Sequence, residues 1–246
     1  MERKRFYFEK QNLKNNQIVL NSDEFHHMIN VMRLREGDSV VLFCGDGMDY
    51  NCTIEEIKKK EAILKVEGIV KNNTEINSNI VVFQALAKGE KLSLIAQKLT
   101  EIGISEMCVF ESKFCDVKTN TSRLDKLNKV VISASKQCGR STIMKINDKP
   151  ITFNDLLNRI KEFDVCYIAY ENETKQTLAE NMLARKTIKS AAVIIGPEGG
   201  FAKEEVGKIV EAGAVSVSLG ARILRTETAA IYSASIISGL LEKLQK

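Results

Sequence analysis

Two short segments near the C-terminus combine glycine with charged side chains in a pattern that suits a ligand site. Residues 194–201 read Ile-Ile-Gly-Pro-Glu-Gly-Gly-Phe, and residues 219–228 read Leu-Gly-Ala-Arg-Ile-Leu-Arg-Thr-Glu-Thr. Each segment follows an apolar run and precedes a helical pattern, so we expect each to join a strand to a helix. Such loops meet at the carboxyl edge of an α/β sheet, where these folds bind ligands.

The residue types in both segments limit the kinds of ligand site that they could form. Glycine lets the backbone approach a ligand closely, and Pro197 stiffens the first turn. The first segment lacks the lysine of a phosphate-binding P-loop and does not match the GxGxxG pattern, which disfavours a Rossmann nucleotide site. By itself it could also be a tight turn without a ligand. In the second segment, Thr226 or Thr228 could cap the following helix, but capping does not explain Arg222 and Arg225.

The histidines and cysteines of the chain are poorly placed to bind a metal ion or to form disulfides. His26 and His27 are neighbours on a predicted helix and point in different directions, so we predict no metal site. The chain has six cysteines, none in a CxxC motif, which favours reduced, mostly buried thiols and a cytoplasmic location.

The composition is that of a globular protein. The 246 residues are 44% hydrophobic and 28% charged, with a net charge of +4. No apolar run approaches the roughly 18 residues of a membrane span, and no apolar stretch follows the basic N-terminus, so we expect neither a span nor a secretory signal. Residues 84–145 carry 11 Lys or Arg against 6 Asp or Glu, which permits contacts with phosphates.

The pattern of the chain changes at about residue 75. Residues 1–70 contain short strand-like runs around one helix at 22–32, typical of a small β-barrel-like domain. The polar stretch 71–79 reads as a linker. Residues 80–246 alternate apolar strands with helical patterns, including a helix over 92–102 that ends at Gly103. This alternation predicts a mainly parallel sheet covered on both faces.

The paired motifs GPEGGF and LGARILRTETAA resemble those of the SPOUT class of S-adenosylmethionine-dependent RNA methyltransferases. The chain is more closely similar to the RsmE family, which methylates N3 of a uridine in 16S ribosomal RNA. The family's other motifs have counterparts at residues 26–38, 88–103 and 137–140. Lys136, Phe114 and Ala221 depart from residues that are frequent in the family.

The resemblance implies an α/β fold: a C-terminal SPOUT domain with a trefoil knot and an N-terminal PUA-like β-barrel domain that binds RNA. It also implies a homodimer and an S-adenosylmethionine site among three loops. By match, the cofactor residues would be Tyr170, Glu171, Gly196, Glu198, Gly199, Gly200, Leu219, Gly220, Ile223, Leu224, Thr226 and Thr228.

For catalysis we predict that Arg225 stabilises the anion that forms when uracil N3 loses its proton. Arg225 could instead pair with Glu227 or Glu198, and Glu198 could be a base or a brace for its loop. Basic side chains should hold the ribosomal RNA: Arg3, Arg5, Arg33, Lys88, Lys91 and Arg140. Alternative functions are methylation at another RNA position such as the ribose 2′-hydroxyl, a non-catalytic RNA-binding assembly factor, and a phosphate-binding enzyme.

Overall fold

The computed structural model describes residues 4–115 and 121–244, which form two compact units. The N-terminal unit joins Met1–Glu75 to Ile132–Ile143, and the C-terminal unit joins Ile76–Val131 to Met144–Lys246. A division into 1–70, 71–79 and 80–246 is continuous along the chain, so it assigns 132–143 to the second domain. Only tertiary contacts show that this segment belongs with the N-terminal unit.

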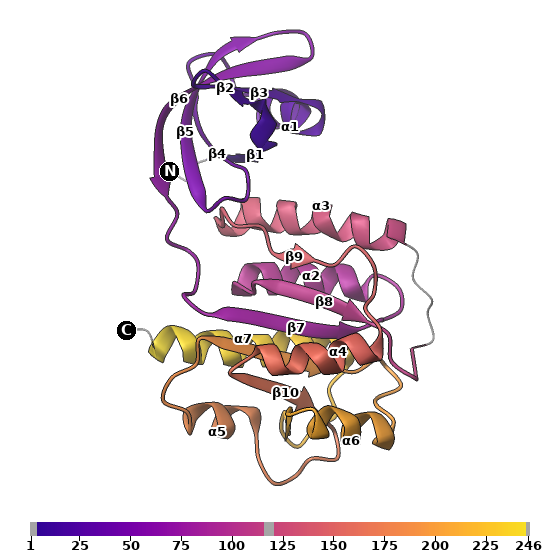
Figure 1. The fold of residues 1–246 in the computed structure, drawn as a ribbon. Helices are drawn as coiled ribbons and strands as arrows, with labels where there is room; N and C mark the ends of the chain where they lie inside the picture. Colours follow the sequence, from indigo (N-terminus) through magenta and orange to yellow (C-terminus); the bar gives the residue numbers. More distant parts are fainter. Residues whose placement is uncertain (1–3, 116–120, 245–246) are drawn as a thin grey trace. The chain divides into compact units, whose positions relative to one another are not determined.

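The N-terminal unit is built on a six-stranded sheet in the order β1-β4-β5-β6-β3-β2 (Figure 1). β1 and β4 are parallel, and the other neighbours are antiparallel. The β-rich character expected for this part of the chain is confirmed. The strands are β1 (Arg5–Tyr7), β2 (Leu13–Lys14), β3 (Gln17–Asn21), β4 (Ser39–Phe43), β5 (Met48–Ile57) and β6 (Glu61–Lys71).

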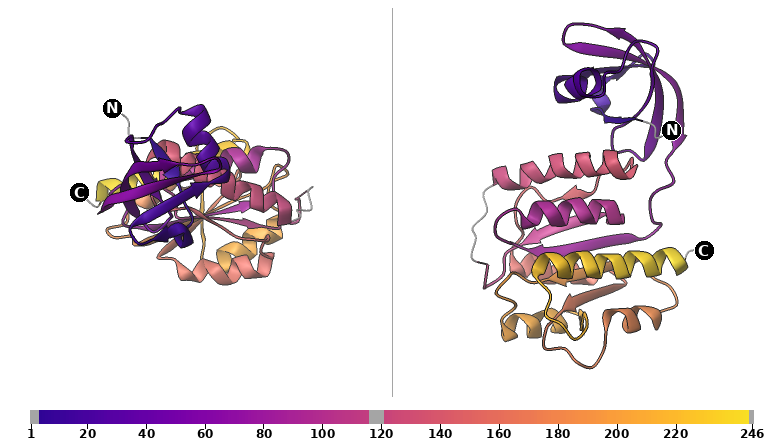
Figure 2. Two further views of the ribbon diagram at one scale, coloured as in Figure 1. Left: turned by 90° about the horizontal axis from the view of Figure 1, so that it is seen from above. Right: turned by 180° about the vertical axis from the view of Figure 1, so that it is seen from behind.

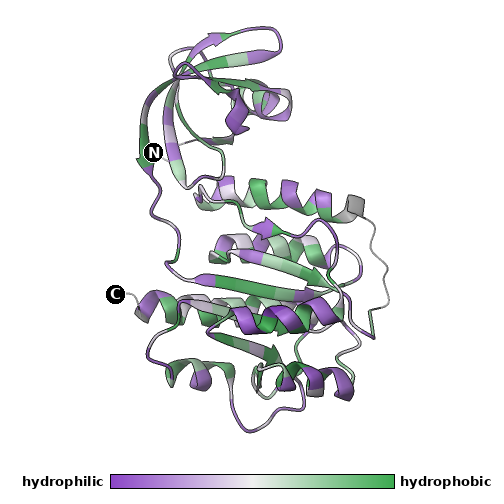
Figure 3. Ribbon diagram, in the orientation of Figure 1, coloured by the Kyte–Doolittle hydropathy of each residue, from purple (hydrophilic) through white to green (hydrophobic). Residues whose placement is uncertain are grey.

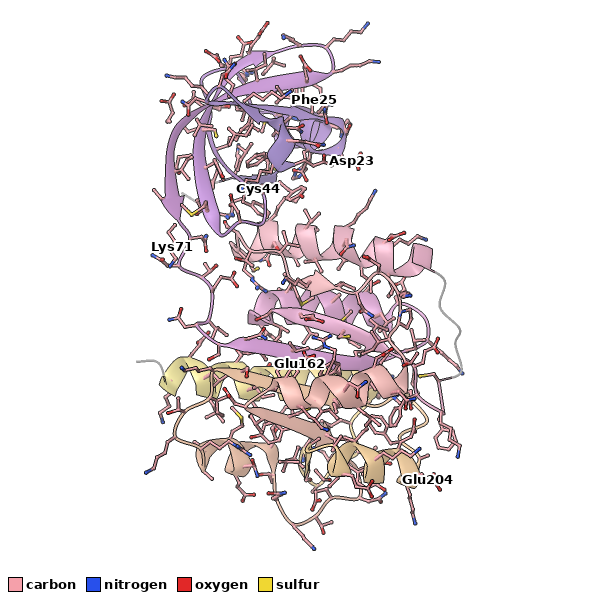
Figure 4. All side chains as sticks on the ribbon, in the orientation of Figure 1. Asp23, Phe25, Cys44, Lys71, Glu162 and Glu204 are labelled. Carbon is pink, nitrogen blue, oxygen red and sulfur yellow. The ribbon has the colours of Figure 1, made fainter. Side chains whose placement is uncertain are left out.

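The predicted helix at 22–32 is shorter and less regular than expected. Helix α1 (Ser22–His26) continues into a π-helical turn, η2 (His27–Val31), and a short 3-10 helix, η1 (Lys10–Asn12), precedes β2. Asn21 takes the N-cap position of α1, and its side chain makes no capping hydrogen bond. Phe25 of α1 and Cys44 after β4 pack against the core of this unit (Figure 4).

The C-terminal unit contains a six-stranded sheet in the order β12-β10-β11-β7-β8-β9, and all neighbours are parallel. The predicted parallel sheet is therefore confirmed. The prediction came from long apolar runs in the sequence, which are typical of strands buried on both faces. The green, hydrophobic colour of β10 and of much of β7 shows the same feature (Figure 3). The strands are β7 (Asn79–Ala85), β8 (Glu106–Phe110), β9 (Lys145–Ile146), β10 (Val165–Ala169), β11 (Ser190–Ile195) and β12 (Val215–Val217).

Helices cover both faces of this sheet. α2 (Lys91–Ile102) and α7 (Thr226–Leu244) pack side by side, and α7 contacts β7 and β11 (Figure 2). The opposite face of β7 packs with α4 (Phe153–Arg159) and α6 (Lys203–Glu211) in one apolar cluster. The remaining helices are α3 (Thr121–Cys138), α5 (Leu178–Leu183) and the 3-10 helix η3 (Ile160–Glu162).

Residues at the helix ends explain where three of these helices begin or end. Helix α2 ends at Gly103, whose φ of +94° is a left-handed conformation that favours glycine. Thr152 and Thr177 begin α4 and α5 as capping boxes, each with an acidic side chain three residues later. Among the described residues, no helix is long and apolar enough to cross a membrane. The trefoil knot stays a prediction.

Candidate active site

A cavity of about 560 Å³ lies at the carboxyl edge of the C-terminal sheet. Its walls are the loops after β10, β11 and β12, together with the first residues of α2 and α7. Every residue predicted to bind the cofactor lines this cavity except Thr228, which is exposed on the first turn of α7. The structure therefore brings together two segments that are separated by about 20 residues in the sequence.

The loop after β11 depends on glycine at two positions. A Cβ atom at Gly196 would lie 2.9 Å from the ring of Phe201, closer than side chains tolerate. Gly200 has a φ of +72°, and a Cβ there would lie 3.1 Å from a carboxylate oxygen of Glu171. These glycines let the loop fold tightly beside the cavity, as close backbone approach to a ligand requires.

Thr226 fixes this loop to the start of α7. Its hydroxyl donates to the carbonyl oxygen of Gly196 at 2.6 Å and accepts from the Gln84 side-chain amide at 3.0 Å. Gln84 is fully buried on β7, and Thr226 is 6% exposed. One hydroxyl thus joins β7, β11 and α7 beneath the cavity, a stronger role than the helix cap that the sequence suggested.

The segment before α7 forms an exposed lip of the cavity. Arg222, Ile223 and Arg225 are exposed, and Ile223 retains 88% of its accessible surface. Arg225 has no ion pair with Glu198 or Glu227 among the described residues, so the structure does not support that pairing. The carboxylates that could have held Arg225 lie instead against Lys91.

Lys91, Glu198 and Glu227 form a charged group at the cavity wall, here called the Lys91 cluster. The Lys91 ammonium lies 2.8 Å from Glu198 Oε1 and 3.7 Å from Glu227 Oε2. Glu198 Oε1 also accepts from the backbone N–H of Lys88 at 3.0 Å. Burial alone would raise the pKa of Glu198, but the hydrogen bonds from Lys91 and Lys88 lower it below its usual range. Glu198 is therefore held as a carboxylate that braces its loop.

Two of the arginines predicted to hold RNA have structural partners within the N-terminal unit. Arg5 forms two hydrogen bonds with the carboxylate of Asp49, at 2.9 and 3.2 Å. Arg140 is 3% exposed and forms two hydrogen bonds with Glu75, at 2.9 and 2.8 Å. Both guanidinium groups are committed to carboxylates, so the geometry favours a bracing role, and their contact with RNA stays a prediction.

The other predicted RNA contacts have different surroundings. Arg33 is exposed and has a φ of +54°, just after the π-helical turn. Lys88 lies in the loop between β7 and α2, and Arg3 lies outside the described residues. Lys136, one of the departures from the family pattern, pairs with Glu24 at 2.6 Å within the N-terminal unit.

The histidines and cysteines take no visible part in a ligand site. His27 packs edge-on against Phe6, with ring centroids 5.7 Å apart. The residues that the structure describes contain no group of three or more His, Cys, Asp or Glu able to hold a metal ion. All six cysteines are free, and burial raises the thiol pKa of Cys52, Cys108 and Cys166 to about 12. Such thiols are inert at neutral pH.

The sequence prediction missed the place of two side chains in the site. Lys91 was expected to contact RNA, yet it lines the cavity, and Gln84 was not singled out. Lys91 begins the helix that follows β7, so the rule that ligands bind at the carboxyl edge could have found it. Gln84 is a lone amide within an apolar run of the sequence. A buried polar side chain of this kind needs a hydrogen-bond partner, and this could have singled it out in the sequence.

Comparisons with known proteins match both units. A model described as an RNA methyltransferase domain matches residues 74–238, and a model described as an RNA methyltransferase PUA domain matches residues 20–67. A ribosomal RNA small subunit methyltransferase E of Bacillus subtilis is 33% identical over 235 residues, which cover 92% of this chain and 91% of that protein.

Solved structures of bacterial proteins share the fold. A Legionella pneumophila putative methyltransferase, in complex with S-adenosylmethionine, is 28% identical, with a TM-score of 0.87 over 97% of this chain and 98% of that one. A ribosomal RNA small subunit methyltransferase E from Neisseria gonorrhoeae, bound to S-adenosylmethionine, is 27% identical, with a TM-score of 0.86 and the same coverage. These similarities confirm the expected fold class, an N-terminal PUA-type domain and a C-terminal α/β domain.

Proposed function

Because the chain belongs to the RNA methyltransferase family, we propose that it transfers the methyl group of S-adenosylmethionine to N3 of a uridine in 16S ribosomal RNA. The observation that carries this proposal is the cavity at the ends of β10, β11 and β12. It is lined by nearly all the residues that the family motif assigns to the cofactor. Relatives with a similar fold were crystallised with S-adenosylmethionine.

The residues of the cavity fit this cofactor. A volume of about 560 Å³ is in the range of pockets for small organic molecules. Gly196, Gly199 and Gly200 line the cavity with backbone, and Leu219 and Leu224 supply apolar surface. We infer that this backbone reads the adenine edge and that the leucines pack against the ring.

S-Adenosylmethionine supplies a methyl group on a positively charged sulfur, which leaves as a neutral thioether. The protein must position the acceptor in line with that methyl group, and positioning alone can contribute roughly 7–11 kcal/mol. It must also favour the N3 anion of uracil, because the neutral imide nitrogen is a poor nucleophile. Arg225 on the lip of the cavity is a predicted donor to a uracil carbonyl oxygen. Glu198 is assigned to bracing the loop.

The N-terminal unit is proposed to bind the ribosomal RNA, in line with the PUA model that it matches. Exposed basic side chains such as Arg33 would contact phosphates, so binding should weaken steeply as salt rises. We also infer that the protein acts in the cytoplasm, which its free cysteines support, and as a homodimer, which the family resemblance implies.

Two measurements test the function in turn. Isothermal titration calorimetry with S-adenosylmethionine should show binding at one site per chain, and no binding would favour a non-catalytic RNA-binding protein. Mass spectrometry of ribosomal RNA from cells lacking the protein should show loss of one N3-methyluridine, which returns when the gene is restored. Loss of a ribose methyl group instead would contradict the assignment of N3.

A further inference from the structure

Lys91 lines a second cavity as well as the large one. This groove, of about 540 Å³, is formed by Lys91 with Glu90, Ser93, Leu94, Gln97 and Val130. Leu94 is 42% exposed although it belongs to α2, which packs against α7. The Lys91 side chain therefore stands where the proposed cofactor cavity and a neighbouring groove meet. A methyltransferase requires its acceptor at such a position, beside the donor and open to it.

The Lys91 ammonium is held in place but not saturated. A lysine ammonium has three N–H donors. Among the described residues, one acceptor lies at hydrogen-bond distance, Glu198 Oε1 at 2.8 Å. Glu227 Oε2 is 3.7 Å away, too far for a hydrogen bond, and it is buried without a hydrogen-bond partner in the part of the chain that the structure describes. The two carboxylates thus hold the cation, and within the described part of the chain only one of its three N–H donors has a hydrogen-bond acceptor.

The groove suits a flat base with polar edges. Leu94 and Val130 offer apolar surface for a ring, and Ser93 and Gln97 offer a hydroxyl and an amide for its edge. Recognition of single-stranded RNA commonly combines such surfaces with a base turned out of its stack. A uracil placed there would meet Lys91 on the side that faces the cofactor cavity.

We propose that this groove receives the target uracil and that the Lys91 ammonium donates to a carbonyl oxygen next to N3. This inference rests on the proposed function. In the reaction the N3–H bond breaks and the proton leaves to water. The N3 electron pair then forms the bond to the methyl carbon while the carbon–sulfur bond breaks, and its electron pair stays on sulfur. Lys91 stabilises the negative charge that N3 shares with its neighbouring carbonyl oxygens.

Lys91 is better prepared for this role than Arg225. A donor stabilises a developing charge most when the protein fixes it before the reaction begins. Lys91 is 31% exposed and its ammonium is fixed by a 2.8 Å hydrogen bond to Glu198, whereas Arg225 is exposed on the lip and has no side-chain partner among the described residues. Lys91 is thus a catalytic residue supplied by α2, in addition to the predicted Arg225.

The direct test observes the base without any methyl transfer. An RNA fragment of the target site is made with 5-fluorouridine at the acceptor position, and its N3 ionisation is followed by fluorine NMR while bound to the full-length protein. Bound to wild type, the base should have an N3 pKa about one unit or more below that of the free RNA. Lys91→Met should bind the RNA but remove this shift, and Lys91→Arg should keep part of it.

Lys98→Met is the matched control, because Lys98 is on the same helix and pairs with Glu101 outside both cavities. It should leave the shift unchanged. A shift that survives in Lys91→Met but disappears in Arg225→Met would overturn the assignment to Lys91. A wild-type protein that shifts no pKa would overturn it as well.

The rate of methyl transfer in single turnovers distinguishes a failure of this inference from a failure of the proposed function. Loss of one fixed donor to a developing anion typically lowers the rate about 10²- to 10³-fold, so Lys91→Met should lose that much in single turnovers with saturating cofactor. With a 5-fluorouridine acceptor, which ionises more readily, the loss should be smaller. If wild type makes no N3-methyluridine, the proposed function fails. If wild type makes it and Lys91→Met is equally fast, only the inference about Lys91 fails.

Discussion

The two units each contain a cation paired with carboxylate, but the carboxylates are hydrogen-bonded to different degrees. In the N-terminal unit, the Asp49 carboxylate accepts hydrogen bonds from Arg5, Asn72 and Ser141, here called the Asp49 group together with Asp49. Arg5 Nε of this group is buried without a hydrogen-bond partner among the described residues, so the contrast concerns the carboxylates. In the Lys91 cluster of the C-terminal unit, Glu198 is hydrogen-bonded, but Glu227 Oε2 is not. Both oxygens of the Asp49 carboxylate accept hydrogen bonds. In the Lys91 cluster, by contrast, Glu227 Oε2 accepts none from the described residues, and the cluster lies beside a cavity.

This difference distinguishes a charged group that stabilises the fold from one that takes part in the reaction. A buried carboxylate whose oxygens are both hydrogen-bonded holds its segments together, and losing one partner is costly. A buried polar atom without a partner costs stability, and beside a cavity such an atom marks a place where a ligand or substrate can bind. We therefore assign the Asp49 group to folding and the Lys91 cluster to the reaction.

The largest expected effect on stability belongs to Asp49→Asn. Removing the charge leaves the Arg5 guanidinium, which is 13% exposed, without its counter-ion and should lower the free energy of unfolding by about 3 kcal/mol at pH 7. Urea denaturation measures this loss. Glu56→Gln, in an exposed pair with Lys58, is the control and should change stability by less than about 0.5 kcal/mol. Similar losses in both variants would contradict the comparison.

The same pair has a defined pH dependence. Burial opposes ionisation of Asp49, but hydrogen bonds from Arg5 and Ser141 outweigh it and lower the folded-state pKa of Asp49. Its contribution to stability is therefore complete above the ordinary pKa of an aspartate and is lost as pH falls through the lower folded value. The difference in unfolding free energy between wild type and Asp49→Asn should be constant from pH 6 to 8 and narrow only in acid.

Thr226→Val should have an intermediate effect, concentrated on the cofactor. The substitution leaves the buried Gln84 amide and the Gly196 carbonyl without this hydroxyl, at a cost of about 1–3 kcal/mol. We expect S-adenosylmethionine to bind about tenfold more weakly by calorimetry, because the glycine loop loses its anchor. Ser235→Ala on the same helix removes only a bond to the Ile231 carbonyl and should leave binding unchanged. Equal affinities for wild type and Thr226→Val would show that the anchor is dispensable.

Glu198→Gln should have the smallest effect on stability, below about 1 kcal/mol, because Glu198 and Lys91 are each roughly 30% exposed and such pairs are screened. The pH–rate profile is more informative. The pKa of Glu198 is lowered, so the carboxylate stays ionised above its ordinary pKa and should cause no inflection between pH 5.5 and 8. An inflection in that range that disappears in Glu198→Gln would identify Glu198 as the proton acceptor.

The sequence predicted the architecture better than the chemistry of single side chains. The parallel sheet followed from apolar runs such as 191–195, because strands buried on both faces leave a clear pattern. The cavity followed from two glycine segments that are short and specific. The pairing of Lys91 with Glu198 and Glu227 could not be predicted, since it joins residues more than 100 positions apart. Arg140 looked like an exposed RNA contact because nothing local shows that Glu75 covers it.

The most direct test of this account is the single-turnover rate of methyl transfer to small-subunit ribosomal RNA, with N3-methyluridine measured at saturating S-adenosylmethionine. Asp49→Asn, assayed below its unfolding transition, should transfer the methyl group at nearly the wild-type rate. Lys91→Met should be folded and bind both substrates but react about 10²-fold or more slowly. Equal rates for wild type and Lys91→Met, or a loss of rate confined to folded Asp49→Asn, would contradict the account.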